Sequence, residues 1–325
     1  MTYQQESWIG KRLDGFVIES LVGEGAFSWV FKAVREDVRV SKAIKVAKPS
    51  ELAGQPDPAI ALPTEALAFI SGGTMTVRPD TCQLLGVQAE KLKNNADPAL
   101  VSVETVCMDE NSCYSRMELI EGQTLRESIG SGPIELSLVA DLVKQLDRLS
   151  KNPGFQYHGD IKPDNIMVTS AGVKLIDPGH FGPLDCDEGN LEHCMISTPA
   201  YYPLLTPDDL FAVGIILWEV VCKRHPLDGS SYSATMDKTN LGEELVKWVR
   251  HKELVGQYYL TPILEAGRPS QMQPDLPPIV EEVLLKALRL QIRADNKIDR
   301  GAGFESFAAL AHALDRLSAA GIGQL

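Results

Sequence analysis

The chain has 325 residues, of which 44% are hydrophobic and 23% charged, a composition typical of a globular protein that forms one large domain or two lobes. Its formal net charge of −13 argues against a nucleic-acid partner, because no block of lysine and arginine offsets the repulsion from phosphates. The longest apolar run, residues 210–221, is far shorter than the roughly 20 residues of a membrane span, and the N-terminal residues lack the pattern of a secretion signal. We therefore expect a cytoplasmic protein with no membrane span and with its six cysteines reduced.

The N-terminal part predicts a β-hairpin after a polar arm, residues 1–12. Runs rich in β-branched and aromatic residues at 16–22 and 29–34 flank a glycine-rich tip, Gly23-Glu24-Gly25-Ala26-Phe27-Ser28. Glycines at such a tip let the main chain approach phosphate oxygens closely, with amide hydrogens as donors. A plain hairpin turn is the alternative for the same residues.

The next strand, residues 43–46, carries Lys45 inside an apolar run, where an unpaired ammonium is costly to desolvate. Pro63 stands at the start of a predicted helix that reaches Ile70 and contains Glu65. Glu65 is an acid that can pair with Lys45. It can also be a first-turn acid stabilised by the helix dipole.

Residues 83–88 and 101–107 predict two more strands, joined by an inserted polar loop at 89–98. A strand from Tyr114 to Ile120 then leads into Glu121-Gly122-Gln123-Thr124-Leu125. The apolar spacing after Leu125 becomes helical, which predicts a helical lobe from there onward.

Two polar motifs follow, which we call the catalytic stretch (158–166, His158-Gly159-Asp160-Ile161-Lys162-Pro163-Asp164-Asn165-Ile166) and the metal-binding segment (176–179, Ile176-Asp177-Pro178-Gly179). They border predicted strands at 166–168 and 173–176, with a turn at Gly172. Their aspartates, lysine and asparagine supply one general base and two metal ligands, which phosphoryl transfer from a metal-bound nucleotide requires. A polar hairpin without chemistry is the alternative.

The rest of the chain predicts a polar, acidic loop at residues 180–200 and helices at 209–221 and 304–317. Asp209 begins the first helix, where it can accept main-chain amides of the catalytic stretch or act as a simple N-cap.

The order of these motifs resembles the protein kinase family, whose catalytic loop reads H-R-D-x-K-x-x-N and whose metal-binding triplet reads D-F-G. Gly159 replaces the arginine, Pro178 the phenylalanine, Ser28 the third small-lobe glycine and Leu204 a glutamate. The chain thus resembles a bacterial-type (eukaryotic-like) Ser/Thr protein kinase of the non-RD variant. The resemblance implies an α+β, two-lobed fold: a small β-rich N-lobe with one helix (about 13–117), a hinge (about 118–123) and a larger, mainly helical C-lobe (about 124–320).

The same resemblance implies a site for ATP between the lobes. The residues expected around the nucleotide are Gly23, Gly25, Ser28, Val30, Lys45, Glu65, Glu118 and Ile120. The expected catalytic residues are Asp160, Lys162 and Lys45, and Asn165 and Asp177 are the expected ligands of Mg²⁺, with Mn²⁺ as an alternative ion.

The implied activity is transfer of the γ-phosphoryl group to serine or threonine hydroxyls of a protein substrate. His158-Gly159-Asp160 with Asn165 and Asp177 also resembles aminoglycoside and choline kinases, so a small-molecule phosphotransferase is an alternative. A pseudokinase scaffold is a second one. Lys162 favours the protein kinase, as do residues 197–203, Ser197-Thr198-Pro199-Ala200-Tyr201-Tyr202-Pro203, which resemble the end of a kinase activation segment.

Overall fold

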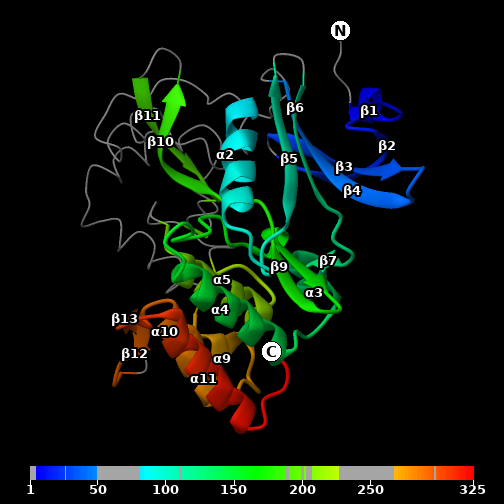
Figure 1. Ribbon diagram of the computed structural model, residues 1–325. Helices are drawn as coiled ribbons and strands as arrows, with labels where there is room; N and C mark the ends of the chain where they lie inside the picture. Colours follow the sequence, from blue (N-terminus) through cyan, green and yellow to red (C-terminus); the bar gives the residue numbers. More distant parts are fainter. Residues whose placement is uncertain are drawn as a thin grey trace, which may run out of the picture.

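The molecule consists of a β-rich lobe and a helical lobe, joined by the segment after strand β6 (Figure 1). The computed structural model describes residues 5–25, 27–49, 81–109, 112–186, 190–198, 201–202, 207–226, 267–295 and 298–325. The predicted helix around Glu65 lies outside these residues. Within them, no helix is long and apolar enough to cross a bilayer.

The β-rich lobe is built on a six-stranded antiparallel sheet with the order β1-β2-β3-β4-β6-β5. Its strands are β1 (Arg12–Leu13), β2 (Phe16–Glu24), β3 (Ser28–Arg35), β4 (Val40–Ala47), β5 (Val103–Asp109) and β6 (Ser112–Glu118). Aromatic side chains, among them Trp29, Phe31 and Tyr114, form a core on this sheet, and Trp8 of the short 3-10 helix η1 (Gln5–Trp8) joins it. The predicted glycine-rich hairpin is the β2–β3 pair.

One helix in this lobe was not predicted. Residues 81–94 form α2 (Thr81–Asn94), so the predicted strand at 83–88 and most of the predicted loop at 89–98 are wrong. The buried side chains are Leu84, Leu85, Ala89 and Leu92, a helical spacing that becomes visible only over the full length of the helix. Helix α2 runs beside β5 (Figure 1).

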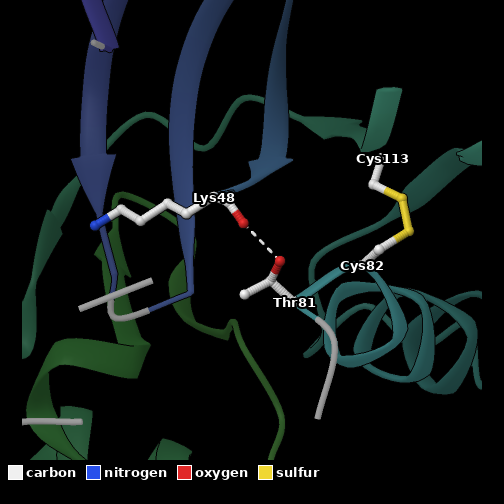
Figure 2. Close-up of a disulfide and its surroundings, with 4 residues drawn as sticks. All are labelled: Lys48, Thr81, Cys82 and Cys113. Carbon is white, nitrogen blue, oxygen red and sulfur yellow. Dashed lines mark hydrogen bonds between the residues drawn. A yellow bond between two sulfur atoms is a disulfide. The ribbon is translucent and has the colours of Figure 1, made fainter. Parts of the chain in front are cut away.

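The start of α2 is bonded to β6 and to Lys48, the residue that follows β4. Figure 2 shows the disulfide that joins Cys82 to Cys113 on β6, and the Thr81 hydroxyl that donates to the carbonyl of Lys48 at 2.5 Å. The expectation of reduced cysteines is therefore wrong for this pair. Folding brings the two residues, 31 positions apart, to a Cα–Cα distance of 5.4 Å, which suits a disulfide.

The helical lobe contains α3 (Leu125–Ser131), α4 (Leu136–Ser150), α5 (Asp209–Cys222), α9 (Pro269–Met272), α10 (Pro278–Ala287) and α11 (Phe307–Ala319). Helix α5 is buried along nearly its whole length, so it is apolar on all sides rather than amphipathic. A three-stranded sheet, β7 (Gln123–Thr124), β8 (Ile166–Thr169) and β9 (Gly172–Leu175), lies where the two lobes meet and positions the two polar motifs.

Two further pairs of strands complete the fold: β10 (His180–Cys186) with β11 (Asn190–Ile196), and β12 (Leu290–Ile292) with β13 (Ile298–Arg300). The β10–β11 hairpin replaces most of the predicted loop at 180–200. That prediction rested on the acidic side chains, whereas strand formation is decided by main-chain pairing across the hairpin.

Candidate active site

The glycine-rich hairpin is closed at its tip by its own main chain. Gly25 N donates to Ser28 O at 2.9 Å, and Gly23 pairs with Val30 across the two strands. Ser28 is buried, and Val30 packs against the main core, the large hydrophobic cluster that extends from β4, β6 and α2 into the helical lobe. The carboxylate of Glu24 pairs with Lys48 at 2.6 Å, so the tip is also held by the residue that directly follows β4, the strand that carries Lys45.

Lys45 lies on β4 with 6% of its surface exposed. Its ammonium donates to Asp177 Oδ1 at 2.7 Å and to Gln88 Oε1 at 2.8 Å. Burial raises the pKa of Asp177, but the Lys45 ammonium outweighs this, and the pKa ends below its usual range. The expected pairing with Glu65 lies outside the described residues. Gln88 was missed because the helix that carries it was read as a strand.

The link between the lobes packs tightly on the sheet beneath it. A Cβ on Gly122 would lie 2.2 Å from the carbonyl oxygen of Val168, so only glycine fits here. Glu118 N donates to Ser102 O at 2.9 Å, and its carboxylate binds Lys174. Ile120 is partly buried against the main core. Of the two expected hinge residues, Glu118 therefore ends β6 and contacts β9, and Ile120 lies in the link that follows it.

Asp160 stands at the centre of the catalytic stretch, with 8% of its surface exposed. Its Oδ2 accepts from Asn165 Nδ2 at 2.8 Å and pairs with Lys162 Nζ at 3.2 Å. Its Oδ1 is buried and, among the described residues, has no hydrogen-bond partner. Lys162 Nζ also donates to Thr198 Oγ1 at 2.7 Å. One carboxylate oxygen is thus fixed, and the other is left to accept a hydrogen bond.

Asn165 joins the catalytic stretch to the metal-binding segment. Its Nδ2 donates to the carbonyl of Asp177 at 3.3 Å, and Ile176 N donates to its main-chain carbonyl at 3.0 Å. Asp177 has a φ of 51°, in the left-handed region that few residues other than glycine adopt. The pair offers one amide and one carboxylate group, a donor set that fits Mg²⁺.

The buried carboxylate of Asp209 fixes the main chain of the catalytic stretch. This buried carboxylate accepts His158 N at 2.5 Å, Gly159 N at 2.9 Å and the hydroxyl of Tyr202 at 2.6 Å. Burial raises the pKa of Asp209, although these donors favour its charged form. The prediction that Asp209 accepts amides of the catalytic stretch is confirmed, whereas the N-cap of α5 is Asp208.

Tyr202 is a supporting residue that sequence reasoning missed. Its hydroxyl accepts Ile161 N at 2.6 Å while it donates to Asp209, so it links the catalytic stretch to α5. His158 is also fully buried and accepts Asp160 N at its Nδ1. Burial, reinforced by the nearby Lys91 ammonium, lowers the pKa of His158 to about 3, so the ring is neutral at physiological pH.

The chain is similar in sequence to known protein kinases. The family described as "Protein kinase domain" matches residues 87–287. Serine/threonine-protein kinase ULK3 of Mus musculus is 27% identical over 256 residues, which are 71% of this chain and 47% of the relative. Serine/threonine-protein kinase PrkC of Bacillus subtilis is 26% identical over 219 residues, which are 62% of this chain and 29% of the relative. The chain therefore spans less than half the length of either relative.

Two solved structures share the fold. The kinase domain of Mycobacterium tuberculosis PknI is 14% identical with a TM-score of 0.52, and the match covers 95% of this chain and 98% of that one. An apo form of PpkA-294 is 15% identical with a TM-score of 0.51, over 94% of this chain and 98% of that one. Together with the sheet and helices described above, they confirm the predicted two-lobed α+β fold.

Proposed function

Because the chain belongs to the protein kinase domain family, we propose that it is an ATP- and Mg²⁺-dependent protein kinase that phosphorylates serine or threonine hydroxyls. The observation that carries the proposal is the position of Lys162, whose ammonium contacts both Asp160 Oδ2 and Thr198 Oγ1. Thr198 belongs to the segment that resembles the end of a kinase activation segment. Because Lys162 links that segment to the proposed catalytic aspartate, a polypeptide acceptor is favoured over a small molecule.

The proposed mechanism is in-line transfer of the γ-phosphoryl group to a hydroxyl. Asp160 orients the hydroxyl and accepts its proton, a role supported by the buried Oδ1 that lacks a hydrogen bond among the described residues. Lys162 neutralises charge on the γ-phosphoryl oxygens, and Lys45 holds the α- and β-phosphates. Asn165 and Asp177 would hold Mg²⁺, or Mn²⁺ in its place, which neutralises charge on the β- and γ-phosphates.

The proposed nucleotide site uses the glycine-rich hairpin and the link between the lobes. The hairpin residues are Gly23, Gly25, Ser28 and Val30. Main-chain groups at Glu118 and Ile120 meet the adenine edge. Glu65 stays a proposed partner of Lys45, in addition to the contacts that the ammonium makes with Gln88 and Asp177.

A phosphotransfer assay with γ-labelled ATP tests this function. Wild-type protein is incubated with a protein lysate and, in parallel, with a panel of amino-sugars and amino-alcohols. Asp160→Asn is the inactive variant, and Asp315→Asn, which removes an exposed carboxylate on α11, is the matched control. We expect acid-stable label on serine or threonine of proteins with wild type and Asp315→Asn, and none with Asp160→Asn.

The two alternatives give different results in the same assay. Label on an amino-sugar or amino-alcohol, with none on protein, would assign a small-molecule phosphotransferase, for which Gly159 provides the resemblance. Binding of Mg-ATP in isothermal titration without transfer to any acceptor would assign a pseudokinase scaffold. Either result would overturn the proposed function.

A further inference from the structure

Helix α2 carries two polar side chains toward the metal-binding segment, Gln88 and Lys91, three positions apart and so on one face of the helix. Gln88 Nε2 donates to the carbonyl of Pro178 at 2.9 Å while its Oε1 accepts from Lys45. Lys91 Nζ donates to the next carbonyl, that of Gly179, at 3.1 Å. Two successive carbonyls of the metal-binding segment are thus bound from one helix.

Lys91 also reaches the catalytic stretch, because its ammonium donates to the carbonyl of His158 at 3.2 Å. That same carbonyl accepts Gly179 N at 2.9 Å. The ammonium therefore lies at the point where the main chains of the two motifs meet, and it binds one carbonyl from each.

The surroundings of Lys91 favour a fixed cation. The ammonium lies 4.3 Å from the ring centroid of Tyr157 and 5.2 Å from that of Phe155, distances at which the ring faces attract a positive charge. Burial lowers the pKa of Lys91 to about 8, and the charge of Asp209 on α5 opposes this decrease. The other titratable groups beside the ammonium are the neutral His158 of the catalytic stretch and Tyr157, which directly precedes it.

We propose that Lys91 is a positioning residue, whose ammonium clamps the catalytic stretch to the metal-binding segment and so sets Asp160 relative to Asp177. The clamp acts next to Asp177, whose left-handed main chain needs support from its neighbours. This inference rests on the proposed phosphotransfer function.

The experiment compares wild type with Lys91→Met, which keeps an unbranched side chain but removes the charge and the donors. Lys93→Met is the matched control, because Lys93 lies on the same helix and is exposed. Initial rates across pH give kcat and KM for Mg-ATP, and hydrogen exchange with mass spectrometry reports on peptides that contain residues 157–162 and 176–180. Circular dichroism confirms that each variant is folded.

We expect kcat of Lys91→Met to fall about 10- to 100-fold, the loss that a small misplacement of reacting groups can produce, with Lys93→Met within about twofold of wild type. Wild-type kcat should also decline as pH rises through about 8, where Lys91 loses its charge, and this decline should be absent from Lys91→Met. Both peptides should exchange faster in Lys91→Met.

Three results would overturn the proposal: a kcat of Lys91→Met within twofold of wild type, the same alkaline decline in both proteins, or unchanged exchange in the two peptides. The exchange measurement does not depend on turnover. A wild-type protein that transfers no phosphate would refute the proposed function, while exchange would still decide whether Lys91 clamps the two motifs.

Discussion

Tyr202→Phe removes a single hydroxyl that links the catalytic stretch to α5. The side chain is 1% exposed, and its hydroxyl makes two hydrogen bonds of 2.6 Å, one from Ile161 N and one to Asp209 Oδ1. Without the hydroxyl, the amide of the fully buried Ile161 has lost its partner, which costs about 1–3 kcal/mol. Asp209 loses one hydrogen bond but keeps two main-chain donors, so this loss costs less than that of the Ile161 amide. We expect the free energy of unfolding to decrease by about 2–4 kcal/mol in total.

Activity should fall together with stability. Ile161 lies between Asp160 and Lys162, so a loosened amide at this position displaces both functional side chains. We expect kcat to decrease about tenfold while nucleotide affinity changes little, because the proposed nucleotide-binding residues of the glycine-rich hairpin and β4 lie on other elements.

Tyr201→Phe is the matched control. The Tyr201 hydroxyl accepts from Arg126 and donates to Glu219 at 2.7 Å, but Arg126 also reaches Glu219 directly at 2.8 Å, so the charges stay paired without it. Tyr201→Phe should lower the free energy of unfolding by about 1 kcal/mol or less, and its kcat should stay within about twofold of wild type. Urea denaturation and initial-rate measurements on both variants provide the comparison. Equal stabilities and equal rates for the two variants would refute the reasoning.

Three further predictions concern the site and the stability of the fold. Asp177→Asn should weaken Mg-ATP binding in isothermal titration, whereas Asp160→Asn should bind normally and fail only in turnover; loss of binding in both would contradict these roles. The free energy of unfolding should fall by about 2 kcal/mol from pH 7.5 to pH 5 because of His158, since the unfolded chain takes up a proton near pH 6.5 that the folded protein binds only near pH 3. Urea denaturation should therefore show a weaker pH dependence in His158→Asn, and an equal dependence would argue against a neutral buried ring. Reduction of the Cys82–Cys113 disulfide should lower the free energy of unfolding by about 3–4 kcal/mol, given the 31-residue separation, and a reductant should not affect the double serine variant.

The sequence by itself predicted which residues form the centre of the candidate site, because these residues are close along the chain. Asp160, Lys162 and Asn165 lie within one short stretch, and two strands that turn at Gly172 bring Asp177 beside them. Short β-branched and aromatic runs also predicted β2 and β3, and helical apolar spacing after Leu125 predicted the helical lobe, whereas α2 was missed. These patterns are local, so they are visible without knowledge of the fold.

The tertiary structure decided which distant side chains support these residues. Lys45 and Asp177 are 132 positions apart, and Lys91 is 67 positions from His158. Neither Gln88 nor Lys91 carries a local signal of its role, because the sequence predicted a strand at 83–88 and a loop at 89–98 where the structure has α2. The Cys82–Cys113 disulfide and the bond from Ile161 to Tyr202 likewise depend on helix and strand packing. Such contacts follow from how elements pack in three dimensions, which the spacing of residues along one element does not encode.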